Sequence, residues 1–265
     1  MGIVNFRPLA GKVLRSIKGP KFRPPARDGD RYDIQGSWMY IDDKDSMQLT
    51  QYGIYGPEQT ELIKRLLRSD YTCLDVGANI GYFTLIMAKQ AKRVYAFEPE
   101  PRNFDILQKN VAMNNLQNVE LYDVAVAETS YKATLHLCGM NRGMHRLYRS
   151  HWCNDGTVEV RTVRIDDLVQ KADFIKMDIE GAELGALKGM KKLLEKGGTT
   201  LMMEFHPPSI VEYGANPRDV YDFMKSLGYS VEIPELDNDD KEVSFEELER
   251  IANEKAGTNI LCRHR

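Results

Sequence analysis

The spacing of apolar and polar residues becomes regular at about residue 57 and predicts alternating strands and helices. Behind Pro57, Leu62, Ile63 and Leu66 follow a helical spacing, whereas later apolar runs have the length of buried strands. The predicted strands are 71–76, 93–97, 119–123, 173–178, 199–205, 229–233 and 258–262, and the predicted helices are 57–68, 80–90, 101–114, 182–195, 217–227 and 244–255. This alternation favours an α/β fold, with a mostly parallel sheet covered by helices on both faces.

Two segments depart from this rhythm. The stretches 132–138 and 157–164 alternate like exposed strands and flank a polar loop, so we expect a β insertion that covers a site. The stretch 37–46 predicts a short β element that packs on the main domain. The expected organisation is therefore a basic arm with a small β element at 1–56, followed by one domain at 57–265.

The composition is that of an ordinary globular protein, but the charge is distributed unevenly. The 265 residues are 42% hydrophobic and 28% charged, which excludes a collagen, a disordered chain and a disulfide scaffold. Residues 1–27 carry seven basic side chains and no acidic one, while the rest of the chain has a net charge of −10. No apolar run approaches the roughly 18 residues that span a bilayer, and the pattern of a signal peptide is absent, so we expect a cytoplasmic protein.

The basic arm has three interpretations. It is a solvated tail, or it contacts acidic surface in a homodimer, or it lies on an anionic membrane. Residues 9–27 combine basic with apolar side chains, which would give peripheral contact at the inner face of a membrane. The sequence does not choose among the three.

The four cysteines show no spacing typical of a metal site. They are Cys73, Cys138, Cys153 and Cys262, and none belongs to a C-x-x-C pair. We therefore expect reduced thiols, with neither a zinc site nor a disulfide.

A glycine turn at residues 75–81 (DVGANIG) joins a predicted strand to a predicted helix. Gly77 permits a tight turn and a close approach of a ligand to the backbone, and the helix after Gly81 presents free N–H groups. A dinucleotide site needs G-x-G-x-x-G for its pyrophosphate, whereas this turn has two glycines and begins with a carboxylate, Asp75. The acid favours a cationic or hydrogen-bond-donating ligand, and the alternative is a purely structural turn.

Acidic residues also stand at the tips of the next two predicted strands. Glu98 follows Asp75 by 23 residues and precedes Pro99, a position from which a carboxylate can accept both hydroxyls of a ribose. Asp123 ends the third strand, with the small side chain of Ala125 beyond it. Three such tips in succession indicate a binding crevice rather than solvated strand ends.

Several motifs follow one another between about residues 50 and 206. They are DVGANIG, then AFEPEP at 96–101, then a helix end with Asn110, Val111, Asn114 and Asn115, then KMDIEGAELGALKGM at 176–190. In this order they resemble the FkbM-type S-adenosylmethionine-dependent methyltransferases. The match is weaker before residue 50, after residue 215 and in the loop 139–156, where we expect substrate choice to lie.

The resemblance implies a Rossmann-like class I methyltransferase fold. Its sheet has seven strands, mostly parallel with the last one antiparallel, here with a short N-terminal extension and the β insertion. The implied cofactor is S-adenosylmethionine, with Glu98 on the ribose hydroxyls and Asp123 and Ala125 beside the adenine. The residues expected to bind the cofactor are Asp75, Gly77, Ala78, Asn79, Gly81, Glu98, Pro99, Asp123, Ala125 and Asp178.

The groups for catalysis are expected at the ends of the fourth and fifth strands, beside the cofactor crevice. Methyl transfer needs a positioned acceptor, exclusion of water and often a base that removes a proton from a hydroxyl. His206 is the candidate base because its ordinary pKa lies near neutrality, and its structural alternative is a capping residue before Pro207. Glu183 is expected only to begin a helix. The candidate catalytic residues are Lys176, Asp178, Glu204 and His206.

Two carboxylates and an imidazole, from Asp178, Glu204 and His206, would also suit a hard cation. A divalent cation is nevertheless not predicted, because residues at strand tips need not converge. The metal site stays an alternative to the proton-transfer roles of the same residues.

The function favoured by these patterns is O-methylation of a hydroxyl on a sugar, a glycolipid (including a lipid-linked glycan) or a small natural product. Amine methyltransferases commonly carry a [DN]-P-P-[FYW] turn where this chain has D-I-E-G. A tRNA guanine methyltransferase is the first alternative, but the acidic body disfavours a nucleic-acid partner. A non-catalytic S-adenosylmethionine-binding module is the second.

Overall fold

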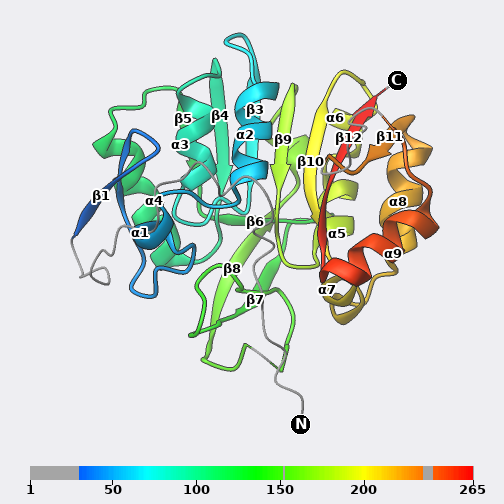
Figure 1. Cartoon of the computed structure of the whole chain (residues 1–265). Helices are drawn as coiled ribbons and strands as arrows, with labels where there is room; N and C mark the ends of the chain where they lie inside the picture. The colour runs from blue at the N-terminus through cyan, green and yellow to red at the C-terminus, as the bar shows by residue number, and fades with distance from the viewer. Residues whose placement is uncertain (1–29, 152, 235–240, 265) are drawn as a thin grey trace.

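A seven-stranded sheet forms the centre of the molecule (Figure 1). The computed structural model describes residues 30–151, 153–234 and 241–264, so the basic arm, with the membrane contact considered for residues 9–27, lies outside the described residues. The strand order is β11-β12-β10-β9-β3-β4-β5, where β3 is Thr72–Val76, β4 Arg93–Phe97, β5 Val119–Tyr122, β9 Phe174–Met177, β10 Thr200–Phe205, β11 Tyr229–Glu232 and β12 Thr258–His264. The last strand, β12, is antiparallel to both of its neighbours and the other paired strands are parallel, which confirms the predicted fold class.

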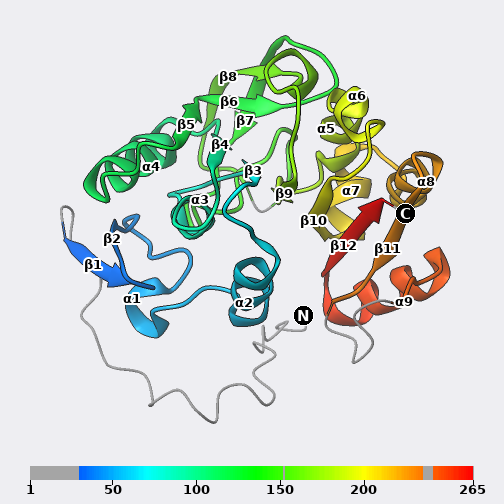
Figure 2. The same ribbon diagram turned by 90° about the horizontal axis from the view of Figure 1, so that it is seen from above.

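Helices cover both faces of this sheet because successive strand residues point to opposite sides. Within β3, Cys73 belongs to one buried apolar cluster and Leu74 to the other. Figure 2 shows α2 and α3 on one side of the sheet and α5 and α6 on the other. The first cluster takes side chains from α2 (Pro57–Leu66), α3 (Tyr82–Ala88) and α4 (Pro101–Met113), and the second from α5 (Glu183–Gly189), α6 (Lys191–Leu194), α7 (Pro207–Tyr213), α8 (Pro217–Ser226) and α9 (Phe245–Lys255).

The helices differ from the predicted ones in three places. The helix expected over 182–195 is broken at Met190, next to Gly189, where an added Cβ would lie 2.0 Å from the carbonyl oxygen of Ala127. The helix α7 was not predicted, although Pro207 stands at its first position, a common start signal. A short helix, α1 (Leu49–Tyr52), was also missed. None of the described helices is long and apolar enough to cross a membrane.

The short β element before residue 57 is a hairpin of β1 (Arg31–Ile34) and β2 (Ser37–Tyr40). Asn110 of α4 and Asn114, which caps the end of that helix, bind its edge, since the N–H of Tyr40 donates to Asn110 Oδ1 at 2.7 Å and the N–H of Trp38 donates to Asn114 Oδ1 at 3.0 Å. Asn110 also donates to the carbonyl of Ile80 at 2.8 Å. The asparagines of the helix-end motif therefore tie the hairpin to the glycine turn. The domain boundary at residue 57 stays a prediction.

The β insertion forms a second sheet, of order β6-β8-β7, which lies below the central sheet in Figure 1. Its strands are β6 (Val124–Val126), β7 (Lys132–His136) and β8 (Thr157–Val163). The strand β6 was not predicted, because it follows β5 after one residue and leaves the central sheet to pair with β8. We call the segment between β7 and β8, residues 137–156, the lid.

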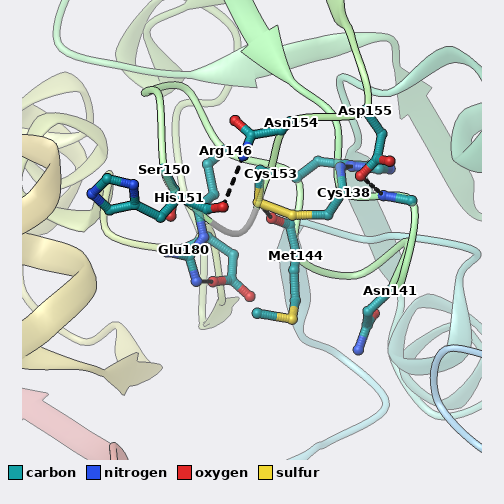
Figure 3. Close-up of a disulfide and its surroundings, with 12 residues drawn as sticks. Cys138, Asn141, Met144, Arg146, Ser150, His151, Cys153, Asn154, Asp155 and Glu180 are labelled. Atoms are coloured by element: carbon teal, nitrogen blue, oxygen red, sulfur yellow. Dashed lines mark hydrogen bonds and ion pairs between the residues drawn. A yellow bond between two sulfur atoms is a disulfide. The ribbon is translucent and has the colours of Figure 1, made fainter. Parts of the chain in front are cut away.

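A disulfide between Cys138 and Cys153 closes the lid (Figure 3). The prediction that all four cysteines are reduced was wrong for this pair, while Cys73 and Cys262 are free and buried. Pairing of His136 with Thr157 brings the two ends of the lid together, and the sulfurs then meet across 15 residues of sequence. That register was not readable from cysteine spacing.

The disulfide should stabilise the folded protein by about 3 kcal/mol, because it closes a loop of some 15 residues in the unfolded chain. We expect Cys153→Ser to lower the free energy of unfolding by about this amount. Urea denaturation of the oxidised protein and of the variant measures the difference.

The control is the wild-type protein in reductant. Since Cys138–Cys153 is the disulfide among the described residues, reduction should bring the wild-type midpoint to that of the variant. An oxidised wild type with the same midpoint as its reduced form would contradict the expectation.

Candidate functional site

A cavity opens at the carboxyl ends of β3, β4, β9 and β10, where the predicted crevice lies. Residues 76–79 and 97–99 line one part of it, and Asp178, Glu180 and Glu204 line another. Residues 141–145 of the lid also contribute, so the insertion covers the site as expected. The wall is completed by residues on the hairpin side of the fold, Ser46, Met47 and Tyr55.

The glycine turn adopts its shape because two backbones meet closely. Gly77 has φ +80°, and an added Cβ would lie 2.0 Å from the carbonyl oxygen of Asp178, so only glycine fits. Asn79 also has a positive φ, of 50°, and its N–H donates to Glu98 Oε2 at 2.8 Å. Gly77, Ala78 and Asn79 line the cavity, whereas Gly81 packs against Leu107 outside the lining.

Asp75 lies fully buried and is not among the residues that line the cavity. Thr84 Oγ1 donates to its Oδ2 at 2.6 Å, and its Oδ1 lies 3.8 Å from Lys176 Nζ. Burial raises the pKa of Asp75, and Lys176 opposes this rise. The structure therefore places Asp75 as a support of the turn rather than at its ligand-facing side.

Lys176 is held by three partners. Its Nζ lies 3.8 Å from Asp75 and 3.8 Å from Asp178, and it donates to the carbonyl of Gly77 at 3.2 Å. The residue lines the cavity but is only 4% exposed. This cation joins β3, β9 and the glycine turn.

Glu98 lines the cavity with both oxygens engaged by backbone. Its Oε2 accepts from Asn79 and its Oε1 accepts the N–H of Glu100 at 2.9 Å. Burial raises the pKa of Glu98 to about 7 against the effect of these two donors. Pro99 and Ala125 line the cavity beside it.

Asp123, in contrast, is exposed and outside the cavity lining. Its Oδ1 accepts from Arg161 Nη2 at 2.8 Å, on the small sheet. The expected adenine contact is not assembled by the structure. The cause is the departure of β6 from the central sheet directly after this residue.

Three carboxyl groups converge in the acidic part of the cavity: Asp178, Glu180 and Glu204. Burial, and then the charge of Asp178, raises the pKa of Glu180 to about 8, while Arg146 opposes the rise. Burial followed by Asp178 and Glu180 also raises the pKa of Glu204. The same three carboxyl groups, after burial, raise the pKa of Tyr55.

His206 caps a helix instead of facing the cavity. Its Nδ1 accepts the N–H of Ser209 at 3.1 Å at the start of α7 and lies 2.7 Å from the hydroxyl of Ser209. Burial and then Arg146 lower its pKa. The structure therefore shows the capping alternative. Among residues 30–151, 153–234 and 241–264, no three His, Cys, Asp or Glu side chains are grouped to hold a metal ion.

Glu183 begins α5, as expected, and is buried. Its Oε1 accepts the N–H of Gly181 at 3.2 Å and that of Ile179 at 3.4 Å. Burial raises its pKa to about 7. Glu183 therefore stabilises the D-I-E-G turn by accepting hydrogen bonds from two of its backbone N–H groups.

Two residues that line the cavity were given no role from the sequence. Glu180 stood in the quoted D-I-E-G motif two residues after Asp178, and Arg142 stood in the loop where substrate choice was expected. Arg142 of the lid lines the cavity and donates its N–H to Ser46 Oγ at 2.7 Å. Only the fold brings the lid and the hairpin side together, so no local signal reveals this contact.

Comparison with known proteins finds a matching family and several relatives. The model of the methyltransferase FkbM domain matches residues 75–231. The chain is 29% identical over 191 residues to hexuronic acid methyltransferase AglP of Haloferax volcanii, covering 69% of this chain and 74% of that protein. It is 25% identical over 195 residues to 2-O-methyltransferase NoeI of Sinorhizobium fredii, covering 66% of this chain and 79% of the relative.

Among solved structures, the chain is similar to methyltransferase FkbM of Methylobacillus flagellatus, with a TM-score of 0.44 and 20% identity. That match covers 62% of this chain and 40% of the other. A putative methyltransferase of Streptococcus mutans, solved with SAH, has a TM-score of 0.46 and 14% identity, and covers 77% of this chain and 94% of the other. Because the family model spans more than half of its residues, the chain belongs to the FkbM methyltransferase family.

Proposed function

We propose that the protein is an S-adenosylmethionine-dependent O-methyltransferase that acts on a hydroxyl of a sugar, a glycolipid or a small natural product. The observation that carries the proposal is one cavity with two chemically different parts. The glycine turn, Glu98 and small apolar side chains line one part, and Asp178, Glu180 and Glu204 line the other. A lid covers both, which suits a transfer from which water must be excluded.

The residues of the first part fit the cofactor by their chemistry. Glu98 has carboxylate lone pairs for ribose hydroxyls, and Pro99 and Ala125 offer a small apolar surface for a purine ring. Gly77 and Asn79 bring backbone close to the ligand. When bound, the cofactor supplies a methyl group activated by a sulfonium, whose positive charge the nearby Asp178 favours.

The second part suits an acceptor rich in hydroxyls. Carboxyl oxygens accept hydrogen bonds from hydroxyl groups, and Tyr55 adds an aromatic face beside Asp178 and Glu204. The names of two relatives, a hexuronic acid methyltransferase and a 2-O-methyltransferase, support a sugar or related hydroxyl acceptor. Asp178 and Glu204 thus keep their proposed roles at the acceptor, Lys176 positions Asp178, and His206 is no longer favoured.

The alternatives fit the site less well. A protein that binds RNA is expected to present a positively charged surface to it, whereas several carboxyl groups line this cavity. A non-catalytic module would not need an acidic acceptor part under a lid. A homodimer, contact of residues 9–27 with a membrane, and the compartment stay predictions.

Protonation of Glu98 should weaken cofactor binding. Its pKa of about 7 in the free protein means that the ionised form, which ribose hydroxyls prefer as an acceptor, is lost as the pH falls below about 7. We expect the affinity for S-adenosylhomocysteine to fall by up to about tenfold per pH unit there. Calorimetric titration between about pH 5.5 and 8.5, with the ionic strength held constant, measures this dependence.

The matched variants are Glu98→Gln and Asp105→Asn, the second on the exposed face of α4. Glu98→Gln should weaken binding about 10- to 100-fold and abolish the pH dependence, because a charged acceptor is lost. Asp105→Asn should bind like wild type. A wild-type affinity that does not change with pH would refute the role of Glu98.

The acceptor class is tested by labelled methyl transfer from S-adenosylmethionine. Methyl glycosides of neutral hexoses and of a hexuronic acid, and total RNA, are offered in parallel. We expect label in at least one glycoside and not in RNA. Asp178→Asn should lower this transfer at least about tenfold, because a displaced acceptor reacts slowly.

Asp123→Asn is the control, since it removes another strand-tip carboxylate that lies outside the cavity. It should keep activity within about twofold of wild type. Label in RNA alone would replace the proposal by the RNA alternative. Equal losses in the two variants would show that Asp178 has no special role.

A further inference from the structure

Glu180 projects into the cavity from a backbone that is unusual for its residue type. Its φ is +57°, and Gly181 follows with φ +104°. An added Cβ on Gly181 would lie 2.4 Å from the carbonyl oxygen of Ser209, so the turn is pressed against α7. A left-handed backbone at a residue other than glycine carries a cost that is common at functional sites.

The lid holds the side chain of Glu180 through Arg146, which is 5% exposed (Figure 3). Arg146 Nη2 donates to Glu180 Oε2 at 3.0 Å. Its Nη1 donates to Tyr148 Oη at 2.8 Å and to Glu212 Oε2 at 3.3 Å. Glu180 Oε1 accepts no hydrogen bond from the described residues, and the side chain of Glu180 lines the cavity.

The other candidates for a base are less suited. His206 uses Nδ1 in its helix cap and lies outside the cavity lining. Lys176 is a cation bound by two carboxylates. Among the described residues Glu204 has no ion pair, and burial with three neighbouring carboxyl groups raises its pKa well above the ordinary value, against the opposing charge of Lys176.

We propose that Glu180 is the catalytic residue that accepts the proton of the acceptor hydroxyl, and that Arg146 is the positioning residue that aims it. This inference rests on the proposed O-methylation. The hydroxyl oxygen gains the methyl group as the carbon–sulfur bond breaks, and its proton passes to Glu180. The products are a methyl ether, a neutral thioether and a protonated carboxyl group, so atoms and charge balance.

The electrostatics of the turn support this role. Asp178 raises the pKa of Glu180 and Arg146 lowers it, which leaves it at about 8. A base is most effective when its pKa lies near the working pH. An unpaired carboxylate in the same place would be harder to ionise.

The first test compares Glu180→Gln with Glu159→Gln, which breaks an exposed ion pair with Lys132 on the small sheet. Methyl transfer to the preferred glycoside gives kcat and KM, and calorimetry gives the Kd of S-adenosylhomocysteine. Glu180→Gln should lower kcat by about 10²- to 10⁴-fold and leave KM and Kd within about threefold. Glu159→Gln should match wild type in all three.

The second test concerns Arg146. Arg146→Met should lower kcat at least about tenfold without a matching change in the Kd of S-adenosylhomocysteine, and Arg146→Lys should restore part of the loss because it keeps the charge. A merely structural role would lower thermal stability and cofactor affinity in both variants, with no rescue by lysine.

Retention of more than one-tenth of the wild-type kcat by Glu180→Gln would overturn the inference, as would a loss confined to KM. In either case the wild type still methylates the glycoside, so the proposed function stands. A wild type that binds S-adenosylhomocysteine but labels no hydroxyl acceptor would instead refute the proposed function, and this inference with it.

Discussion

The buried ammonium group of Lys176 is the interaction on which the arrangement of the site depends. It lies between Asp75 on β3 and Asp178 at the end of β9 and also donates to the carbonyl of Gly77. A charge buried this deeply is tolerated only when it is paired, and removal of one partner leaves the other uncompensated. The three contacts therefore hold the glycine turn and the acidic part of the cavity in one fixed relation.

The lid adds a second constraint, because it connects parts of the chain that the central sheet leaves apart. The Cys138–Cys153 disulfide closes its base, Arg142 binds Asp43 on the hairpin side, and Arg146 binds Glu180. The two arginines thus connect the lid to opposite parts of the chain around the cavity, the hairpin side and the turn that carries Glu180. A disulfide of this kind persists where the surroundings do not reduce it, so its redox state bears directly on the compartment expected from the sequence.

Local patterns were sufficient for the central sheet but not for the lid. The strand Arg93–Phe97 was predicted to the residue and the other strands of the central sheet to within two residues, because strands of a parallel sheet read as continuous apolar runs. Glu98 and Gly77 line the cavity as expected of residues at strand tips, because the carboxyl ends of parallel strands face one crevice. The expected adenine contact of Asp123 is not assembled because β6 turns away after it. The disulfide and the pairing of Arg146 with Glu180 were not predicted, because both depend on the register of β7 with β8.

The formal net charge of −10 on residues 28–265 counts every carboxyl group as ionised, which does not hold for the carboxyl groups in and around the cavity. Glu98 and Glu183 have pKa values of about 7, that of Glu180 is about 8, and that of Glu204 is raised as well. Near neutral pH Glu98, Glu180 and Glu183 hold part of their protons, and a protonated carboxyl group donates a hydrogen bond as well as accepting one. Arg146 forms an ion pair with Glu180 and favours its ionised form, whereas the charge of Lys176 opposes the effect of burial and of three carboxyl groups on Glu204, so the two glutamates differ in their electrostatic environments. Neighbouring carboxyl groups that differ in this way can take different roles, which agrees with the proposed role of Glu180 as the group that accepts the proton.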